Sequence, residues 1–190
     1  MVATHEVAVQ EIPEKELIER AKVDNRYFEA IYRKYHERIF RLILSRVQNL
    51  DVSQDLTSSA FCKAMVNLHK YKDQGLNFSS WLYRIALNIC YDYFREKKKQ
   101  RFVVMEDYMT ENLVEELDLD REAMEEWLTH LPELLEGLKP QDLELIELRF
   151  FEGKSFRDIG YILDITENNA KTRTYRILKR VKKKFELSRP

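Results

Sequence analysis

The feature that most constrains the fold of this 190-residue chain is a run of apolar side chains at helical spacing between residues 28 and 47. Its members are Phe28, Ile31, Tyr35, Ile39, Leu42, Ile43 and Val47. Steps of three and four residues bring them onto one side of a helix, and such a face must be buried against other elements. The chain has only four Gly and four Pro, so few turns are signalled and long helices are predicted throughout.

Two further stripes of the same kind follow along the chain. In the second predicted helix the inward-facing residues are Leu56, Ala60, Phe61, Ala64, Met65 and Leu68. In the third they are Leu82, Ile85, Ala86, Ile89 and Tyr93. Asp51 or Ser53 is expected to cap the second helix and Ser79 or Ser80 the third, with a loop over residues 71–77 between the two helices. Three such helices predict one bundle over residues ~20 to 101.

The chain changes character after residue 101. Residues 106–126 hold ten Asp or Glu and one Arg, and we predict an acidic linker over residues 102–119. A helix is expected from about Asp120 to Glu136, where Gly137 stops it. Another starts at Pro140, which suits a first helical turn, and ends at Gly153. The sequence therefore predicts an all-α fold of two small helical domains.

The last segment predicts two helices joined by a three-residue turn, residues 164–166, which is the spacing of a helix-turn-helix. Ser155 with Asp158 fits a capping box, and Thr166 can cap the final helix from about Glu167 to Phe185. Its outer side would carry Asn168, Asn169, Lys171, Thr172, Arg173, Tyr175, Arg176 and Lys179. Arg pairs with guanine, Asn with adenine, and Lys with phosphate, so this face suits a DNA major groove. The alternative is a helical hairpin with a solvated basic face.

The third helix of the bundle carries a polar stripe opposite its predicted core face. Arg84, Asn88 and Arg95 lie on one side, and the segment runs on into Lys and Arg at residues 97–101. Taken alone, such a stripe is more often a solvated face, and Trp81 and Phe78 can be plain core. Nucleic-acid binding is the competing interpretation, since aromatic and basic side chains are interleaved here.

Composition and residue spacing argue against several classes of protein. Cys62 and Cys90 are far apart and form no metal or disulfide pattern, so we expect two small buried groups in a reducing cytoplasm. The first residues lack the basic and apolar regions of a signal peptide, and no apolar run reaches the ~20 residues of a membrane span. The histidines are scattered, at His5, His36, His69 and His130, without paired-ligand spacing. We expect no enzyme activity, no metal, no cofactor and no small-molecule substrate.

The segment from Phe78 to Arg95 has the pattern F-x-x-W-L-Y-R-I-A-x-N-x-x-x-D-x-x-R. This pattern is similar to region two of bacterial RNA polymerase sigma factors of the extracytoplasmic-function (ECF) group. LDVSQDLTSSAFCKAM is similar to the helix before it, and residues 138–181 resemble region four. Ser58 and Ser59 stand where Gln-Glu is common, Met65 replaces the usual Trp, and Asn168 and Asn169 replace a common Gly-Thr.

The resemblance implies a division into an N-terminal segment, 1–22, region two, 23–101, a linker, 102–119, and region four, 120–190. Region four would bind the promoter −35 element with the eight outer residues named above. Region two would bind the −10 element through Phe78, Trp81, Tyr83, Arg84, Asn88, Arg95 and Lys98. The helix before it would dock on the clamp helices of the polymerase largest subunit through Asp51, Asp55, Ser58, Ser59 and Lys63.

Such proteins are cytoplasmic, bind the RNA polymerase core and promoter DNA, and are often held inactive by an anti-sigma factor; we expect the free chain to be a monomer. The alternative is a free-standing helix-turn-helix repressor or activator. It accounts for residues 138–185 but leaves the pattern from Phe78 to Arg95 as coincidence.

Overall fold

The structure is a computed structural model, and it describes residues 12–97, 130, 135 and 137–188. Every regular element in these residues is a helix, which confirms the predicted all-α class. The chain divides into two compact units, residues 1–100 and 101–190. The predicted acidic linker, the helix over residues 120–136 and Lys98 lie largely or wholly outside the described residues.

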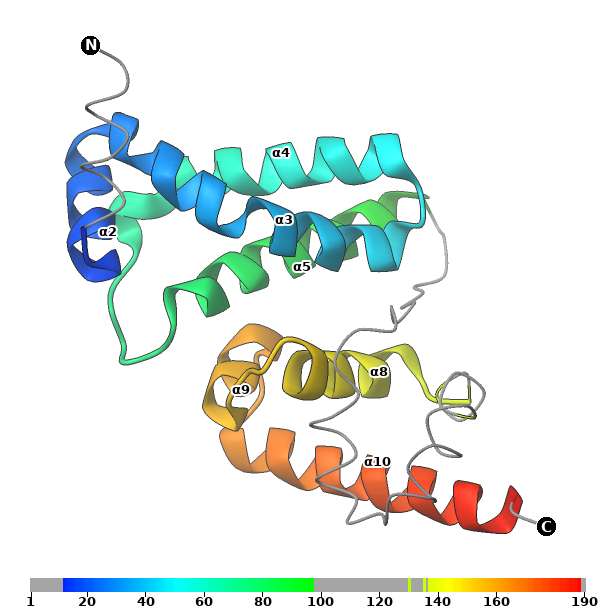
Figure 1. Ribbon diagram of the computed structural model, residues 1–190. Coiled ribbons are helices and arrows are strands. Elements are labelled where there is room, and N and C mark those ends of the chain that lie inside the picture. Colours follow the sequence, from blue (N-terminus) through cyan, green and yellow to red (C-terminus); the bar gives the residue numbers. More distant parts are fainter. Residues whose placement is uncertain (1–11, 98–129, 131–134, 136, 189–190) are drawn as a thin grey trace. The chain divides into compact units, whose positions relative to one another are not determined.

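The first unit is a bundle of α3 (Phe28–Val47), α4 (Leu50–Asn67) and α5 (Phe78–Lys97), with α2 (Glu14–Val23) packed near the start of α3 (Figure 1). Short 3₁₀ turns, η1 (Asn25–Tyr27) and η2 (Leu68–Lys70), follow α2 and α4. The predicted stripe of α3 is confirmed except at its end, where Val47 is half-buried and Arg46 is buried instead. An Arg46 guanidinium nitrogen donates to the Leu42 carbonyl at 2.7 Å, which satisfies part of the buried cation.

The turn between α3 and α4 is short, because only Gln48 and Asn49 separate the two helices. Gln48 adopts the left-handed conformation (φ 53°) and ends α3, and the Asn49 side chain accepts from the Val52 amide at 2.9 Å. Asn49 is therefore the cap of α4, and the assignment of the cap to Asp51 or Ser53 was wrong. Both residues lie inside the helix, because Asn49 already provides the oxygen that the first turn needs.

α5 starts at Phe78, so Ser79 and Ser80 lie within its first turn and are buried rather than capping. The buried face is also rotated from the predicted one. Leu82 and Ala86 are buried as predicted, but Ile85, Ile89 and Tyr93 are only half-buried. The core instead takes Tyr83, Leu87, Cys90 and Phe94. Because α5 is apolar on most sides, periodicity alone did not determine which side faces α3 and α4.

α2 was not predicted and lies partly in the segment assigned to an N-terminal extension. Its Leu17, Ile18 and Ala21 are buried. The helix contacts α3, η1 and η2, so α2 packs as part of this unit.

The second unit contains α8 (Pro140–Ile146), which continues as a π-helical turn, η3 (Glu147–Phe151), followed by α9 (Phe156–Leu163) and α10 (Glu167–Ser188) (Figure 1). Pro140 stands in the first turn and Gly153, with φ 60°, follows the end of η3 as predicted. α10 packs against both α8 and α9. Its buried stripe is formed by Ala170, Thr174, Ile177, Leu178, Val181 and Phe185.

The connection between α9 and α10 has the predicted helix-turn-helix geometry. Ser155 caps α9, with its hydroxyl accepting from the Asp158 amide at 3.0 Å, and Thr166 accepts from the Asn169 amide at 3.1 Å. Asp164 takes the left-handed conformation (φ 59°) that ends α9. A Cβ at Gly160 would lie 2.8 Å from the Ile165 carbonyl, so only glycine allows the turn to approach α9 this closely.

Candidate nucleic-acid and polymerase-binding surfaces

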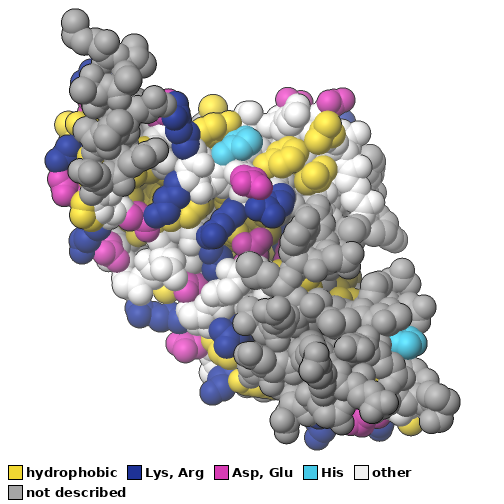
Figure 2. Space-filling view, in the orientation of Figure 1, with side chains coloured by type: hydrophobic (Ala, Val, Ile, Leu, Met, Phe, Trp, Pro, Cys, Tyr) yellow, Lys and Arg dark blue, Asp and Glu magenta, His cyan; other side chains and the backbone are white. Residues whose placement is uncertain are grey.

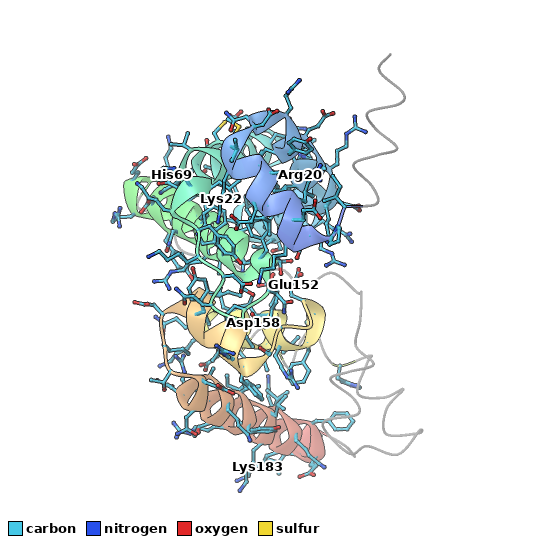
Figure 3. The ribbon with its side chains drawn as sticks, turned by 90° about the vertical axis from the view of Figure 1, so that its left-hand side faces the viewer. Arg20, Lys22, His69, Glu152, Asp158 and Lys183 are labelled. Atoms are coloured by element: carbon cyan, nitrogen blue, oxygen red, sulfur yellow. The ribbon has the colours of Figure 1, made fainter. Side chains whose placement is uncertain are left out.

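The outer side of α10 is exposed, as the helix-turn-helix interpretation requires. The exposed members of the predicted set are Asn168, Asn169, Lys171, Thr172, Tyr175, Arg176 and Lys179. Most of them follow one another at steps of three or four, opposite the buried stripe. Lys183, also exposed, extends away from the helix toward its C-terminal end (Figure 3). The face offers amide, guanidinium and ammonium donors along one straight element, which a major groove can admit.

Arg173 differs from the rest of the predicted set. It is half-buried on the flank of α10 that faces α8, and its guanidinium lies 3.4 Å from a carboxylate oxygen of Asp142. Arg180 reaches the other carboxylate oxygen of Asp142 at 2.8 Å. The sequence analysis did not find Asp142, because this carboxylate belongs to another helix, α8.

Arg149 is a further basic residue close to the exposed side of α10. The Arg149 guanidinium sits 4.7 Å from the ring centre of Phe156, and that ring lies 5.9 Å from the ring of Tyr175. Arg149 also donates to the Lys154 carbonyl at 3.2 Å. A cation over an aromatic face is held in place by the ring quadrupole. Arg149 is thus a further candidate for phosphate contact that the sequence did not single out.

The α5 surface is less open than predicted. Phe78 and Tyr83 are 2% and 0% exposed, so both are core residues, and their assignment to the DNA surface is corrected. Trp81 and Arg84 are half-buried, while Asn88 and Arg95 are exposed, with Arg95 paired to Asp92 at 2.7 Å. The buried aromatics were misassigned because the phase of the helix could not be read from its own sequence.

Trp81 belongs to an aromatic cluster at the start of α5. Its ring lies 5.3 Å from Tyr71 and 5.5 Å from Phe78, and Phe78 lies 5.9 Å from Tyr35 of α3. Aromatic pairs in such edge or tilted arrangements contribute ~0.5–1.5 kcal/mol beyond the area that they bury. The half-exposed Trp81 ring is therefore supported from behind, as a stacking platform for an unpaired base would need to be.

α2 fastens the 71–77 loop to the bundle. Lys15 lies 3.2 Å from Asp73, and the Lys22 ammonium lies 5.6 Å from the centre of the Tyr71 ring. Lys22 projects from α2 in Figure 3. A small pocket is lined by this helix and the loop together, including Ile18 and Leu76. The position of the loop thus depends on a helix that the sequence did not predict.

Glu14 connects α2 to α3 by accepting hydrogen bonds from Lys34, at 2.5 Å, and from the Tyr35 hydroxyl. Partial burial raises the pKa of Glu14, but these two hydrogen bonds and the Lys34 charge outweigh it, so the pKa lies below its ordinary 4.5. Burial, and then the hydrogen bond to Glu14, raise the pKa of Tyr35. Tyr35 therefore remains a neutral donor to the carboxylate.

The predicted polymerase-facing residues of α4 are all exposed: Asp51, Asp55, Ser58, Ser59 and Lys63. The same helix also exposes Cys62, which corrects the expectation of a buried thiol, and Val66, which is 65% exposed. Cys90 is buried as expected.

Next to this face, α3 presents Tyr32 and His36, whose rings lie 4.8 Å and 6.1 Å from Phe61 of α4. Figure 2 shows hydrophobic side chains beside a histidine on the α3–α4 side of the first unit. The α4 surface is thus partly apolar, which the predicted polar residues alone did not indicate.

In the described part of the chain, no group of three or more His, Cys, Asp or Glu is placed to hold a metal ion. Of the helices that the structure describes, none combines the length and apolar character of a membrane span.

Comparison with known families gives two matches. Residues 31–100 match the family described as Sigma-70 region 2, and residues 128–181 match Sigma-70, region 4. The first match contains most of α3 together with α4 and α5, and the second contains α8, η3, α9 and the first part of α10. α2 precedes the matched residues.

Individual relatives agree with these matches. The chain is 31% identical over 164 residues to the ECF RNA polymerase sigma factor SigW of Bacillus subtilis, covering 82% of this chain and 87% of SigW. It is 29% identical over 165 residues to the ECF RNA polymerase sigma factor BldN of Streptomyces coelicolor, covering 86% of this chain but only 62% of BldN.

Among solved structures, the fold is similar to that of the sigma factor RpoE of Bartonella quintana, determined with the anti-sigma factor NepR. The TM-score is 0.59 at 19% identity, covering 85% of this chain and 98% of that chain.

Proposed function

The chain belongs to the extracytoplasmic-function group of sigma-70 factors, and from this premise we propose that it binds the RNA polymerase core and directs it to promoters whose −10 and −35 elements it recognises. The observation that carries the proposal is the presence of both matched regions in one chain, each on its own helical unit. A free-standing helix-turn-helix regulator would account for the second unit alone.

Region four recognises the −35 element through α10. Asn168, Thr172 and Arg176 reach base edges, since they lie on the exposed face near the N-terminal half of the helix. Lys179 and Lys183, nearer its C-terminal end, contact phosphates. Arg149 on its Phe156 platform adds a further phosphate contact.

Region two holds the −10 element at the start and outer side of α5. Trp81 provides the stacking surface, Asn88 and Arg84 provide hydrogen bonds, and Arg95 contacts the backbone. Phe78 and Tyr83 act from the core by supporting this helix rather than by touching DNA. The 71–77 loop borders the same surface, held by Lys15 and Lys22 of α2.

The chain cannot open promoter DNA by itself. Stacking is worth ~1.4 kcal/mol per base-pair step, so a bubble of about ten steps costs on the order of 14 kcal/mol. Each base captured on an aromatic ring returns ~1–3 kcal/mol. Two or three captured bases leave most of that cost unmet, so the remaining free energy must come from contacts with the polymerase core.

The α4 face is the proposed docking site for the clamp helices of the polymerase largest subunit. Asp51, Asp55, Ser58, Ser59 and Lys63 supply its polar contacts. Val66 and Tyr32 add exposed apolar area. Protein interfaces usually combine apolar side chains with polar ones in this way.

Regulation by an anti-sigma factor belongs to the same proposal. A protein that covers the α4 face or the α10 face would block a step that transcription requires. The chain then works in the cytoplasm as a monomer until the polymerase core binds it, without a cofactor or a small-molecule substrate.

The direct test is transcription by core polymerase on a library of randomised promoters, with and without the chain. Enrichment of paired −35 and −10 sequences is expected only when both proteins are present. Co-elution of the chain with core polymerase separates this function from that of a free-standing regulator, which would bind one DNA site without the core. The proposal fails if no promoter is enriched and no complex with the core forms.

A further inference from the structure

Asp142 occupies an unusual place in the second unit. It stands in the first turn of α8, its side chain is only 15% exposed, and its two carboxylate oxygens contact two different arginines of α10. Arg173 lies at 3.4 Å and Arg180 at 2.8 Å. One carboxylate therefore binds two guanidinium groups across a helix–helix contact.

The two arginines are about two helical turns apart, so they lie on the same flank of α10. This flank is not the outer face that carries Thr172, Arg176 and Lys179. Arg173 is half-buried there, whereas the Arg180 side chain is 56% exposed. Both groups border the DNA-facing surface without being part of it.

A carboxylate and a phosphate compete for the same guanidinium donors, because both accept paired N–H bonds from Arg. Contacts to phosphate raise the affinity for every sequence, whereas contacts to base edges raise it only for the right one. An arginine held on Asp142 therefore adds less to non-specific binding than it would without that carboxylate.

We propose that Asp142 is a specificity-determining positioning residue: it holds Arg173 and Arg180 against α8 and so keeps non-specific duplex binding weak relative to binding of the −35 site. The inference rests on the proposed function of α10. It assigns Arg173 to the flank rather than to base reading, and it makes α8 part of the recognition apparatus although α8 itself touches no base.

The test is a salt titration of the affinity of the full-length chain for two duplexes, one with the −35 sequence found in the library experiment and one scrambled. Asp142→Asn removes the charge at nearly constant shape. If the released arginines reach phosphates, the slope of log affinity against log salt steepens by ~0.9 for each new arginine–phosphate contact, and about two such contacts are possible. The preference for the −35 duplex over the scrambled duplex falls several-fold.

Two matched variants isolate the cause. Glu186→Gln removes the same charge from an exposed position of α10, and it should change the slope less than Asp142→Asn does. The double variant Asp142→Asn with Arg180→Gln lacks one of the two released arginines, so its slope should be shallower than that of Asp142→Asn by about one phosphate. An unchanged slope and preference in Asp142→Asn overturns the proposal, as does an equal effect of Glu186→Gln.

One variant covers the case in which Asp142→Asn does not fold, as judged by its helical circular dichroism. Arg180→Gln alone should leave the non-specific slope of the otherwise unchanged chain nearly as it is, because Asp142 already occupies that arginine. A slope that becomes shallower by a full phosphate contact overturns the proposal. If the unchanged chain shows no sequence preference at all, it is the proposed function of α10 that fails.

Discussion

The two helices assigned to DNA, α5 and α10, expose their polar side chains in different ways. α10 has a narrow buried stripe and a wide exposed side, so most of its predicted contacts are already at the surface. α5 is buried over much of its circumference and exposes Asn88 and Arg95 beside a half-buried Trp81. Each helix packs against two others, α5 against α3 and α4, and α10 against α8 and α9. The difference therefore follows from their sequences, because α5 has apolar side chains around most of its circumference, whereas α10 carries Asn, Lys and Arg on its outer side.

This difference suits two kinds of DNA. A straight exposed helix can enter the groove of a closed duplex without rearrangement. An aromatic ring supported by other rings suits a base that has already left the stack. Recognition of duplex and capture of unpaired bases thus require different amounts of burial. Substitutions at Tyr83, Arg176, Trp81 and Glu14 test this contrast between the two units.

The largest effect is expected for Tyr83→Ala, because this side chain is fully buried in the first unit. Removing a buried aromatic side chain costs ~3–5 kcal/mol of unfolding free energy. The matched variant is Tyr175→Ala on α10, whose side chain is 42% exposed. It should change stability by less than ~0.5 kcal/mol, and urea denaturation followed by circular dichroism measures both. Equal stability losses in the two variants would remove the contrast between the helices.

Arg176→Ala should cost ~1–3 kcal/mol in discrimination at one base pair of the −35 element, with little change in stability. Binding to a panel of single-substituted duplexes measures this. Arg176→Lys keeps the charge but not the paired geometry, so it should lose discrimination while retaining the salt dependence. Uniform weakening across the panel would instead assign Arg176 to phosphate.

Trp81→Ala should weaken open complexes more than closed complexes, by ~1–3 kcal/mol for one lost stacking contact. Potassium permanganate footprinting of unpaired thymines, compared with gel-shift binding, separates the two steps. Trp81→Phe keeps an aromatic face and should recover part of the loss. If Trp81→Ala lowers the stability of the first unit and impairs both complexes equally, Trp81 acts only as a core residue.

The smallest effect is expected for Glu14→Gln, and it concerns the stability of the first unit at acidic pH. Because the pKa of Glu14 is lower in the folded chain than its ordinary 4.5, its contribution to stability is present above that value. The contribution is lost as pH falls through the folded pKa. Glu14→Gln should therefore make the unfolding free energy less sensitive to pH below about 4.5, while the second unit shows no change. Unfolding followed by circular dichroism across this pH range measures the effect. An unaltered acid profile in this variant would mean that the contacts to Lys34 and Tyr35 do not stabilise the ionised carboxylate.

The helix-turn-helix could be predicted almost completely from local residues. Ser155 and Thr166 cap their helices, and Asp164 turns the chain, as their side-chain chemistry indicates. The exposed side of α10 followed from the same periodicity. The contact of Asp142 with Arg173 could not be predicted, because the two residues are 31 positions apart and meet only through the packing of α8 against α10.

The first unit was harder to predict for the same reason. α2 has only three buried side chains, and Leu17, Ile18 and Ala21 are too few to stand out as a stripe in ten residues. The buried side of α5 was predicted in the wrong phase, so Phe78 and Tyr83 were placed on the DNA surface. The two errors have opposite causes. α2 has too few apolar side chains to show a clear apolar face, whereas α5 has so many that several sides could be the buried one.

By itself, the sequence determined that the described part of the chain is helical, where α8, α9 and α10 begin, and which residues face away from the core of α10. These properties depend on interactions within a few residues: caps, turns and the 3.6-residue repeat. Only the tertiary structure decided which side of α5 is buried, that α2 supports the 71–77 loop, and which acid binds Arg173. Those outcomes depend on neighbours distant in sequence, and a helix shows its own periodicity but not the identity of what packs against it.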